Sequence, residues 1–342
     1  MIPRRYLGRL GGNGPSCPLP PYTHTLFGTF GAFQKEHIAQ ILSDERWYGD
    51  EAPRWRNAPW SDDAIKSRKK ATSRLAHKAF ATVAGAAGLS RILESCAPGR
   101  RCGSQSCYEC GRAFQRWLVD AVGRLLGKQH DGYQDFTFNF VMPDGQAAIK
   151  QLGTVDFLDI MAKCRSALDS CSAVEFAVVA FDTSANDDTE KFTKGKYTTG
   201  PVVYFQVHMY GIVRTNDRKA VWKALRPLFA KAANIYRPLH IPKKVFNGSN
   251  KGISYLLKPD AFRRVSYLYE KAAKPYWTTK NPAPALKPSE HVFYMLAMHA
   301  LDFIGRIGLV GLHPVRTKAT KHRKPGVGLR RVYRRRAVPS AD

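Results

Sequence analysis

Four cysteines fall within fifteen positions of this sequence, at Cys96, Cys102, Cys107 and Cys110. Two residues separate Cys107 from Cys110, a spacing that lets two thiolates reach one tetrahedral ion with Zn–S bonds of about 2.3 Å. In a reducing compartment such clustering favours a metal over disulfides, and we prefer it to four free thiols. The spacing is irregular for a double zinc ribbon, so one ligand could come from elsewhere, such as a histidine. The pattern predicts a structural Zn²⁺ site, since no open catalytic position is indicated.

A second group of polar residues lies on one predicted strand, residues 202–213. Its β-branched and aromatic residues predict a strand that is buried on at least one face. Side chains alternate along a strand, so Gln206, His208 and Tyr210 share a face. Burying such groups costs free energy unless they are paired or bound. The row fits either a half-buried strand with one hydrogen-bonded histidine or a face that binds a metal or a phosphate.

The third candidate is Tyr255, which stands three positions before Lys258. On a helix this spacing places both side chains on one face. A cation beside a phenol favours the phenolate, so the pair could supply a nucleophile. The alternative is a packing tyrosine beside a surface lysine.

The chain of 342 residues is strongly basic, with 54 Lys and Arg against 27 Asp and Glu and a formal net charge of +27. Such an excess predicts a polyanionic partner, with nucleic acid favoured over a membrane surface. Basic runs are often only solvated, but on DNA they add salt-dependent affinity. The residues that we expect to contact DNA are Lys66, Arg68, Lys69, Lys70, Arg330, Arg331, Arg334, Arg335 and Arg336.

The most hydrophobic window, residues 292–312, contains Asp302, Arg306 and His299. Charges at mid-membrane depth are expensive, so we expect an amphipathic or buried helix and no membrane association. The basic, Gly-rich N-terminal residues are not followed by an apolar run of signal-peptide length. We therefore expect an intracellular protein.

Apolar periodicity predicts the elements that carry these residues. The order of strands and helices indicates an α+β fold with a central, mainly antiparallel sheet and flanking helices. Strands are predicted at residues 136–141, 174–182 and 202–213, and helices at 61–93, 112–128, 155–168, 218–233 and 290–312.

Three of these pieces, in this order, resemble the motifs of the HUH endonucleases, named for histidine–hydrophobic–histidine. They are Phe136-Thr-Phe-Asn-Phe140, the strand from Val207 to Val213, and Tyr255-Leu-Leu-Lys258. The closest group resembles the rolling-circle replication initiators of plasmids and filamentous phages. The series Cys102-x4-Cys107-x2-Cys110 is similar to the N-terminal zinc motif of many such initiators. The resemblance covers about residues 96–270.

The resemblance implies an endonuclease and DNA strand transferase. Tyr255 would attack the scissile phosphate of single-stranded origin DNA, giving a 5′-phosphotyrosine link and a free 3′-OH that primes synthesis. Lys258 would orient the phosphate or balance charge, and Mg²⁺ or Mn²⁺ would polarise the phosphate. Host helicase and polymerase would be partners in the cytoplasm of a bacterial host cell.

The sequence departs from the family at the histidine pair, because only His208 is present. If His208 is the second histidine, Gln206 takes the first place; if it is the first, Tyr210 takes the second. We favour Gln206 with His208, because a carbonyl oxygen is a better ligand for Mg²⁺ or Mn²⁺ than a neutral phenol. Asp182 is the expected acidic third ligand, and Glu175 is the alternative.

Two other functions stay open. The missing histidine favours a catalytically impaired, zinc-containing DNA-binding protein, and a single-tyrosine transposase of the same superfamily would share the chemistry. The expected organisation is a basic, partly helical region (1–95), a cysteine cluster with a helix (96–128), a HUH-like nuclease domain (129–275), a helical extension (276–314) and a basic flexible tail (315–342).

Overall fold

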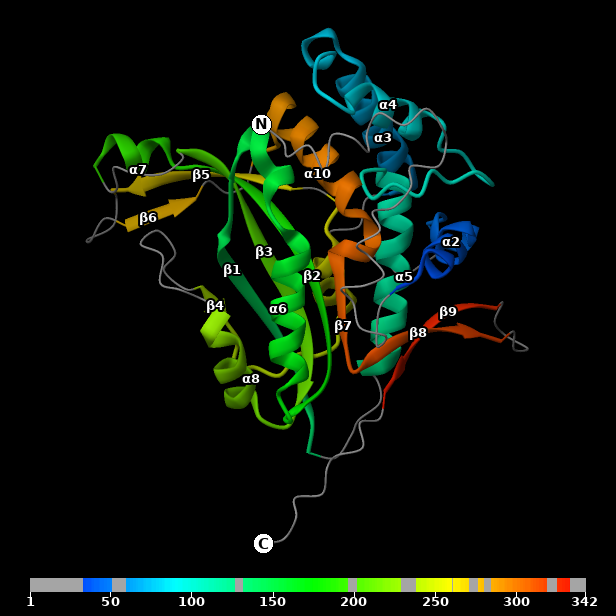
Figure 1. Cartoon of the computed structure of the whole chain (residues 1–342), viewed down its shortest axis with the longest axis vertical. Helices are drawn as coiled ribbons and strands as arrows, with labels where there is room; N and C mark the ends of the chain where they lie inside the picture. The colour runs from blue at the N-terminus through cyan, green and yellow to red at the C-terminus, as the bar shows by residue number, and fades with distance from the viewer. Residues whose placement is uncertain are drawn as a thin grey trace, which may run out of the picture.

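The computed structural model shows an α+β protein with helices packed on both faces of a central sheet (Figure 1). This agrees with the predicted α+β class and flanking helices, and the likeness to the HUH endonuclease fold stays a prediction. The structure describes residues 33–50, 60–126, 132–195, 202–228, 238–259, 261–270, 276–279, 284–318 and 325–332.

Within these residues, seven strands form one sheet in the order β4-β1-β3-β2-β5-β6, and β7 also pairs with β2. Every pairing is antiparallel except β2 with β5, so the sheet is mixed. The strands are β1 (Gln134–Ala148), β2 (Val174–Asp187), β3 (Val203–Thr215), β4 (Leu239–His240), β5 (Phe262–Tyr269), β6 (Tyr276–Thr279) and β7 (Ile307–Val310).

The three long strands form where the sequence predicts them, and each extends further than predicted. β1 continues to Ala148 through a register shift between Val141 and Gln146. β2 continues past Asp182 to Asp187, because β3 pairs with it along its whole length. On β3, Gly211 lies opposite Phe138, and a Cβ there would meet the phenyl ring at 2.1 Å. A glycine is therefore required at the point where β3 passes the Phe138 ring.

Two apolar cores lie on the two faces of the sheet. One contains Phe205, Val207 and Met209 of β3 and is covered by α6 and α8. The other contains α5, the segment around Leu256 and most of the N-terminal helices. The helices are α2 (Lys35–Ser43), α3 (Ser61–Ala76), α4 (Ala86–Glu94), α5 (Tyr108–Leu126), α6 (Phe157–Asp169), α7 (Thr189–Thr193), α8 (Arg218–Leu225), α9 (Asn250–Ser254) and α10 (Pro288–Arg306), with 3-10 turns η2 (Glu45–Trp47), η3 (Lys78–Phe80), η4 (Ile149–Thr154), η5 (Arg226–Leu228) and η6 (Tyr255–Leu257).

Two predicted helices are corrected. The single helix expected over residues 61–93 is divided into α3 and α4. α3 ends at Ala76, because His77 is extended with ψ of 139°, and α4 begins after Gly85, which adopts a left-handed conformation with φ of 84°. The helix expected over residues 290–312 ends at Arg306. Residues 307–310 instead form β7, which adds to the edge of β2.

The tail expected to be flexible is folded in part. β8 (Leu312–Thr317) pairs with β9 (Gly326–Arg331) as a separate antiparallel hairpin. It is fixed to α5 by a hydrogen bond of 2.8 Å, in which Trp117 Nε1 donates to the backbone oxygen of Val327. The domain boundaries themselves stay predictions. In the described part of the chain, no helix has both the length and the apolar character needed to cross a bilayer.

Candidate functional site

The four cysteine side chains of residues 96–110 meet at one point. The Sγ atoms of Cys96 and Cys107 are 3.6 Å apart, those of Cys96 and Cys110 3.7 Å, and those of Cys102 and Cys110 3.8 Å. All four lie within 4.8 Å of one another. Thiolates bound tetrahedrally at Zn–S bonds of about 2.3 Å would be separated by about 3.8 Å. The cluster can therefore hold a metal ion such as zinc.

Local structure brings these thiols together from two helix ends. Cys96 follows the C-terminus of α4, and Ala97 and Arg100 then exchange two backbone hydrogen bonds of 3.2 and 3.0 Å in a tight turn. Gly103 turns the chain again with φ of 70°. Cys107 and Cys110 stand at the start of α5, where the helix dipole favours thiolates. All four ligands thus come from the cluster itself, and the alternative of a distant histidine is not needed.

The buried thiols of the cluster differ in their pKa values. Burial raises the pKa of Cys107, whereas hydrogen bonds from the other three cysteines lower the pKa of Cys96. A buried group of four thiolates requires a compensating cation. Among the described residues, these four cysteines are the group of three or more His, Cys, Asp or Glu side chains whose ligand atoms lie close enough together to bind one metal ion.

A second polar site lies on the sheet, where β2 and β3 run side by side. Asp182 stands directly opposite His208 in the register of the two strands. Lys258 reaches this pair from the segment after η6, with its Nζ 3.1 Å from Asp182 Oδ2. His208 Nε2 lies 2.9 Å from Ser184 Oγ. All four side chains are buried.

Tyr255 stands next to this pair, on η6. Lys258 Nζ is 4.5 Å from the centre of the Tyr255 ring and 5.1 Å from that of Tyr210. The two rings are 6.4 Å apart. The structure therefore brings together Tyr255, Lys258, Asp182 and His208, which the sequence placed on three separate elements.

His208 is held as a neutral imidazole. Burial lowers its pKa to about 3, Arg264 and Lys258 act in the same direction, and Asp182 opposes them. A neutral imidazole is both a metal ligand and a hydrogen-bonding group for a phosphate oxygen.

The other predicted ligands are less favourably placed for a divalent cation. Gln206 Nε2 donates to the backbone oxygens of Met142 at 2.9 Å and Val207 at 3.1 Å. The carboxylate of Asp182 is already paired with Lys258. This donor set does not by itself form a Mg²⁺ or Mn²⁺ site, so such a site stays a prediction and no step is routed through it.

Tyr210 and Glu175, the two alternative metal ligands that the sequence offered, lie in different places. Tyr210 faces Lys258 and Tyr255 and so belongs to the site, although as a ring rather than as a ligand. Glu175 pairs with Arg331 at 2.9 Å. It is seven residues from Asp182 along β2, which corresponds to about 23 Å at the rise of an extended strand.

A cavity of about 180 Å³ opens beside Tyr255. Aromatic side chains of β1 and β3 line it, together with polar groups of Asn139 and His240, which pair across β1 and β4. Sequence reasoning missed His240, because it lies in a Pro-rich basic segment without periodicity. It missed Ser184 because the strand was expected to end at Asp182.

The basic residues predicted to contact DNA are in two different situations. Arg68 forms an ion pair with Glu109 and donates to the backbone oxygen of Leu93 at 2.8 Å, and Arg331 pairs with Glu175. These two arginines stabilise the fold. Four others are exposed: Lys66, Lys69, Lys70 and Arg330. Arg334, Arg335 and Arg336 lie outside the described residues.

No protein-family model matches the chain, and neither the curated proteins nor the solved structures include a significant match. The geometry of the two sites is therefore the basis for a function.

Proposed function

We propose that this protein is a tyrosine-dependent enzyme that nicks and rejoins single-stranded DNA, as an initiator of rolling-circle replication does. The observation that carries the proposal is the meeting of Tyr255, Lys258, Asp182 and His208 on one face of the sheet. A phenol, an ammonium, a carboxylate and an imidazole within one site can supply the nucleophile, the base and the charge stabilisation for a phosphoryl transfer to tyrosine.

Each group has a role in a balanced reaction. Tyr255 Oη attacks the scissile phosphorus and gives up its proton to a base, a role that we assign to the carboxylate of Asp182, because its partner Lys258 lies beside the Tyr255 ring. A Tyr–O–P bond forms and the P–O3′ bond breaks. The departing 3′ oxygen takes up a proton from the Lys258 ammonium, which regains the proton that Asp182 accepted through their hydrogen bond. The DNA 3′ of the nick stays attached as a 5′-phosphotyrosine. Rejoining reverses these steps when a 3′-OH attacks the phosphotyrosine.

Lys258 is placed to stabilise negative charge during this step. Its ammonium lies close to the Tyr255 ring and is held by Asp182, so it is oriented before the substrate arrives. His208, neutral because it is buried, can donate a hydrogen bond from its ring N–H to a phosphate oxygen.

The surroundings of the site suit single-stranded DNA. The aromatic cavity beside Tyr255 offers ring faces for a nucleobase, and base–aromatic stacking contributes about 1–3 kcal/mol per base. The net charge of +27 adds sequence-independent attraction to the phosphate backbone. A metal such as Zn²⁺ at the four cysteines would stabilise the junction of α4 and α5 that packs behind this site.

Two observations favour the alternative of a DNA-binding protein that has lost catalysis. Asp182 and Lys258 neutralise one another, and a second histidine is missing from the strand. Such a protein would bind single-stranded DNA through the same basic surface and aromatic cavity without forming a covalent bond.

The test is a covalent capture with a 3′-fluorescein-labelled pool of oligonucleotides with random centres, incubated with the full-length protein and Mn²⁺. The 3′ label is needed because the adduct retains the DNA on that side of the nick. We expect a denaturant-resistant labelled band that Tyr255→Phe abolishes and that the matched variant Tyr267→Phe, on β5, retains. DNA binding without an adduct would support the catalytically impaired protein instead.

A further inference from the structure

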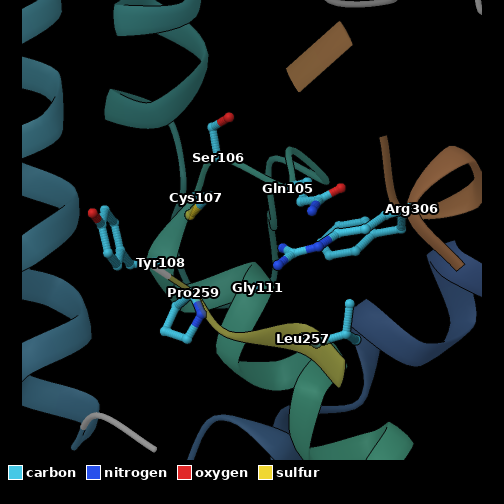
Figure 2. Close-up of a pocket in the computed structure, with 9 residues that line it drawn as sticks. Gln105, Ser106, Cys107, Tyr108, Gly111, Leu257, Pro259 and Arg306 are labelled. Carbon is cyan, nitrogen blue, oxygen red and sulfur yellow. The ribbon is translucent and has the colours of Figure 1, made fainter. Parts of the chain in front are cut away.

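The loop that carries the cysteines also contacts the segment that carries Tyr255 and Lys258. Figure 2 shows the two segments meeting, with Gln105 and Cys107 of the loop on one side and Leu257 and Pro259 on the other. The cavity left between them is only about 10 Å³. Closely packed interiors transmit displacements, so a movement of the cysteine loop would displace the segment that carries Tyr255 and Lys258.

Arg306 connects the two segments through hydrogen bonds. It is the last residue of α10 and is buried, with 4% of its surface exposed. Its Nη2 donates to the backbone oxygen of Lys258 at 2.7 Å, and its Nε donates to the backbone oxygen of Phe181 at 3.0 Å. One guanidinium thus fixes the backbone of Lys258 and the residue before Asp182.

The position of Arg306 follows from a gap in the sheet. β7 pairs with β2 over Ala177 to Ala180, and β5 takes over the same edge from Ser184. Neither β7 nor β5 pairs with the part of β2 between Ala180 and Ser184. In this part of the edge, the Arg306 side chain donates a hydrogen bond to the carbonyl of Phe181. A carbonyl at the end of a helical turn needs a donor, and Pro259 cannot continue the turn, so Lys258 also depends on Arg306.

Gln105 completes the connection to the cysteine loop. In the amide orientation that satisfies both of its ends, Gln105 Oε1 accepts from Arg306 Nη1 at 2.5 Å, and Nε2 donates to the backbone oxygen of Asp302 at 2.8 Å. Asp302 has a φ of 59°, unusual for a residue other than glycine, and interrupts α10 at this point. Gln105 lies between two of the cysteines, so its position depends on how that loop is held.

We propose that Arg306 is a positioning residue that links the metal-holding loop to the tyrosine segment, so that a metal ion at the four cysteines orders Tyr255 and Lys258. The chain of contacts runs from Cys102 and Cys107 through Gln105 to Arg306, and from there to the Lys258 carbonyl. The catalytic consequence rests on the proposed function, whereas the ordering of the segment does not.

The experiment uses Gln105→Met, which keeps the length of the side chain and removes its contacts to Arg306 and Asp302. The control is Ser104→Ala in the same loop, which removes the hydrogen bonds to His299 and to the backbone N–H of Ser106 and leaves Arg306 untouched. Gln105→Glu keeps an acceptor for Arg306 and serves as the rescue. Metal content and circular dichroism identify any variant that fails to fold.

Hydrogen–deuterium exchange of peptides covering residues 252–259 is the first measurement, with the protein loaded with Zn²⁺. We expect Gln105→Met to speed exchange there by about tenfold, and Ser104→Ala and Gln105→Glu to leave it near the wild-type rate. Removing the metal from the wild type with a chelator should produce the same increase, and it should add little in Gln105→Met.

Single-turnover adduct formation is the second measurement. Gln105→Met should lower the rate by about 10- to 100-fold with an unchanged Kd for single-stranded DNA, as expected when reacting groups are displaced by about 1 Å. Unchanged exchange at residues 252–259 in both Gln105→Met and the metal-free protein would overturn the link. An adduct that survives Tyr255→Phe would instead overturn the proposed function, so the two failures are distinguishable.

Discussion

The buried pair of Lys258 and Asp182 allows a direct test of the site by mutation. The two side chains are 10% and 6% exposed, and their charged atoms are 3.1 Å apart. At an effective dielectric constant of about 20, two unit charges at this distance attract one another by about 5 kcal/mol before desolvation is counted. Removing one partner leaves the other charge buried and uncompensated, which typically costs about 3–5 kcal/mol.

We therefore expect Lys258→Met to lower the free energy of unfolding by about 3 kcal/mol or more, and Asp182→Asn to have a smaller effect because the ammonium can turn toward the rings of Tyr210 and Tyr255. The double variant should be more stable than the sum of the two single losses predicts, by about 1–3 kcal/mol. Urea unfolding followed by tryptophan fluorescence measures all three values.

The outcome that would refute this reasoning is additivity. If the double variant loses the sum of the two single losses to within about 0.5 kcal/mol, the two side chains do not interact in solution. The site would then lack the preoriented cation on which the proposed chemistry depends.

Three further predictions concern the metal, the pH dependence and the DNA surface. Cys107→Ser should abolish binding of one Zn²⁺ per chain, measured by competition with a chromophoric chelator, and should lower the Tm by several degrees. His291 contacts Tyr108 at 2.9 Å, and burial, with Arg74 and Lys70, lowers its pKa from 6.5 to about 4. The unfolded chain binds the proton of this histidine more tightly than the folded chain does. The histidine therefore contributes up to about 3 kcal/mol of stability above pH 6.5, and this contribution is lost as the pH falls toward 4. In His291→Gln, the free energy of unfolding measured in urea should depend less on pH over this range. Replacing Lys66, Lys69 and Lys70 with alanine should weaken single-stranded DNA binding and reduce its salt dependence with stability preserved, whereas Arg68→Ala should lower stability because it breaks the pair with Glu109. If Arg68→Ala, and not the lysine variant, weakened the salt dependence of DNA binding, the assignment of the lysines to DNA binding and of Arg68 to stability would be wrong.

The parts of the fold that are encoded locally follow from the sequence. The long strands are runs rich in β-branched and aromatic residues, and the cysteines are close in sequence, so local composition and spacing place both. The contacts that define the site are long-range. Lys258 and Asp182 are 76 positions apart, and no local pattern indicates that one neutralises the other. Their pairing depends on how η6 packs against the edge of β2.

The errors have physical causes as well. Residues 307–310 are apolar, and a buried strand and the end of a buried helix have the same composition over so short a segment. Their assignment was decided by the unpaired edge of β2, which the sequence does not show. The C-terminal hairpin was hidden by its basic composition, although Val327 between the charges is buried against the core around α5.

The most direct test of the central claim is to identify the residue that becomes linked to DNA. Protein trapped with the labelled oligonucleotide pool is digested with trypsin and a nuclease, and the peptides are sequenced by mass spectrometry. We expect a nucleotide attached through a phosphate to Tyr255. Attachment to any other residue, or no attachment in a sample that binds single-stranded DNA, would contradict this claim.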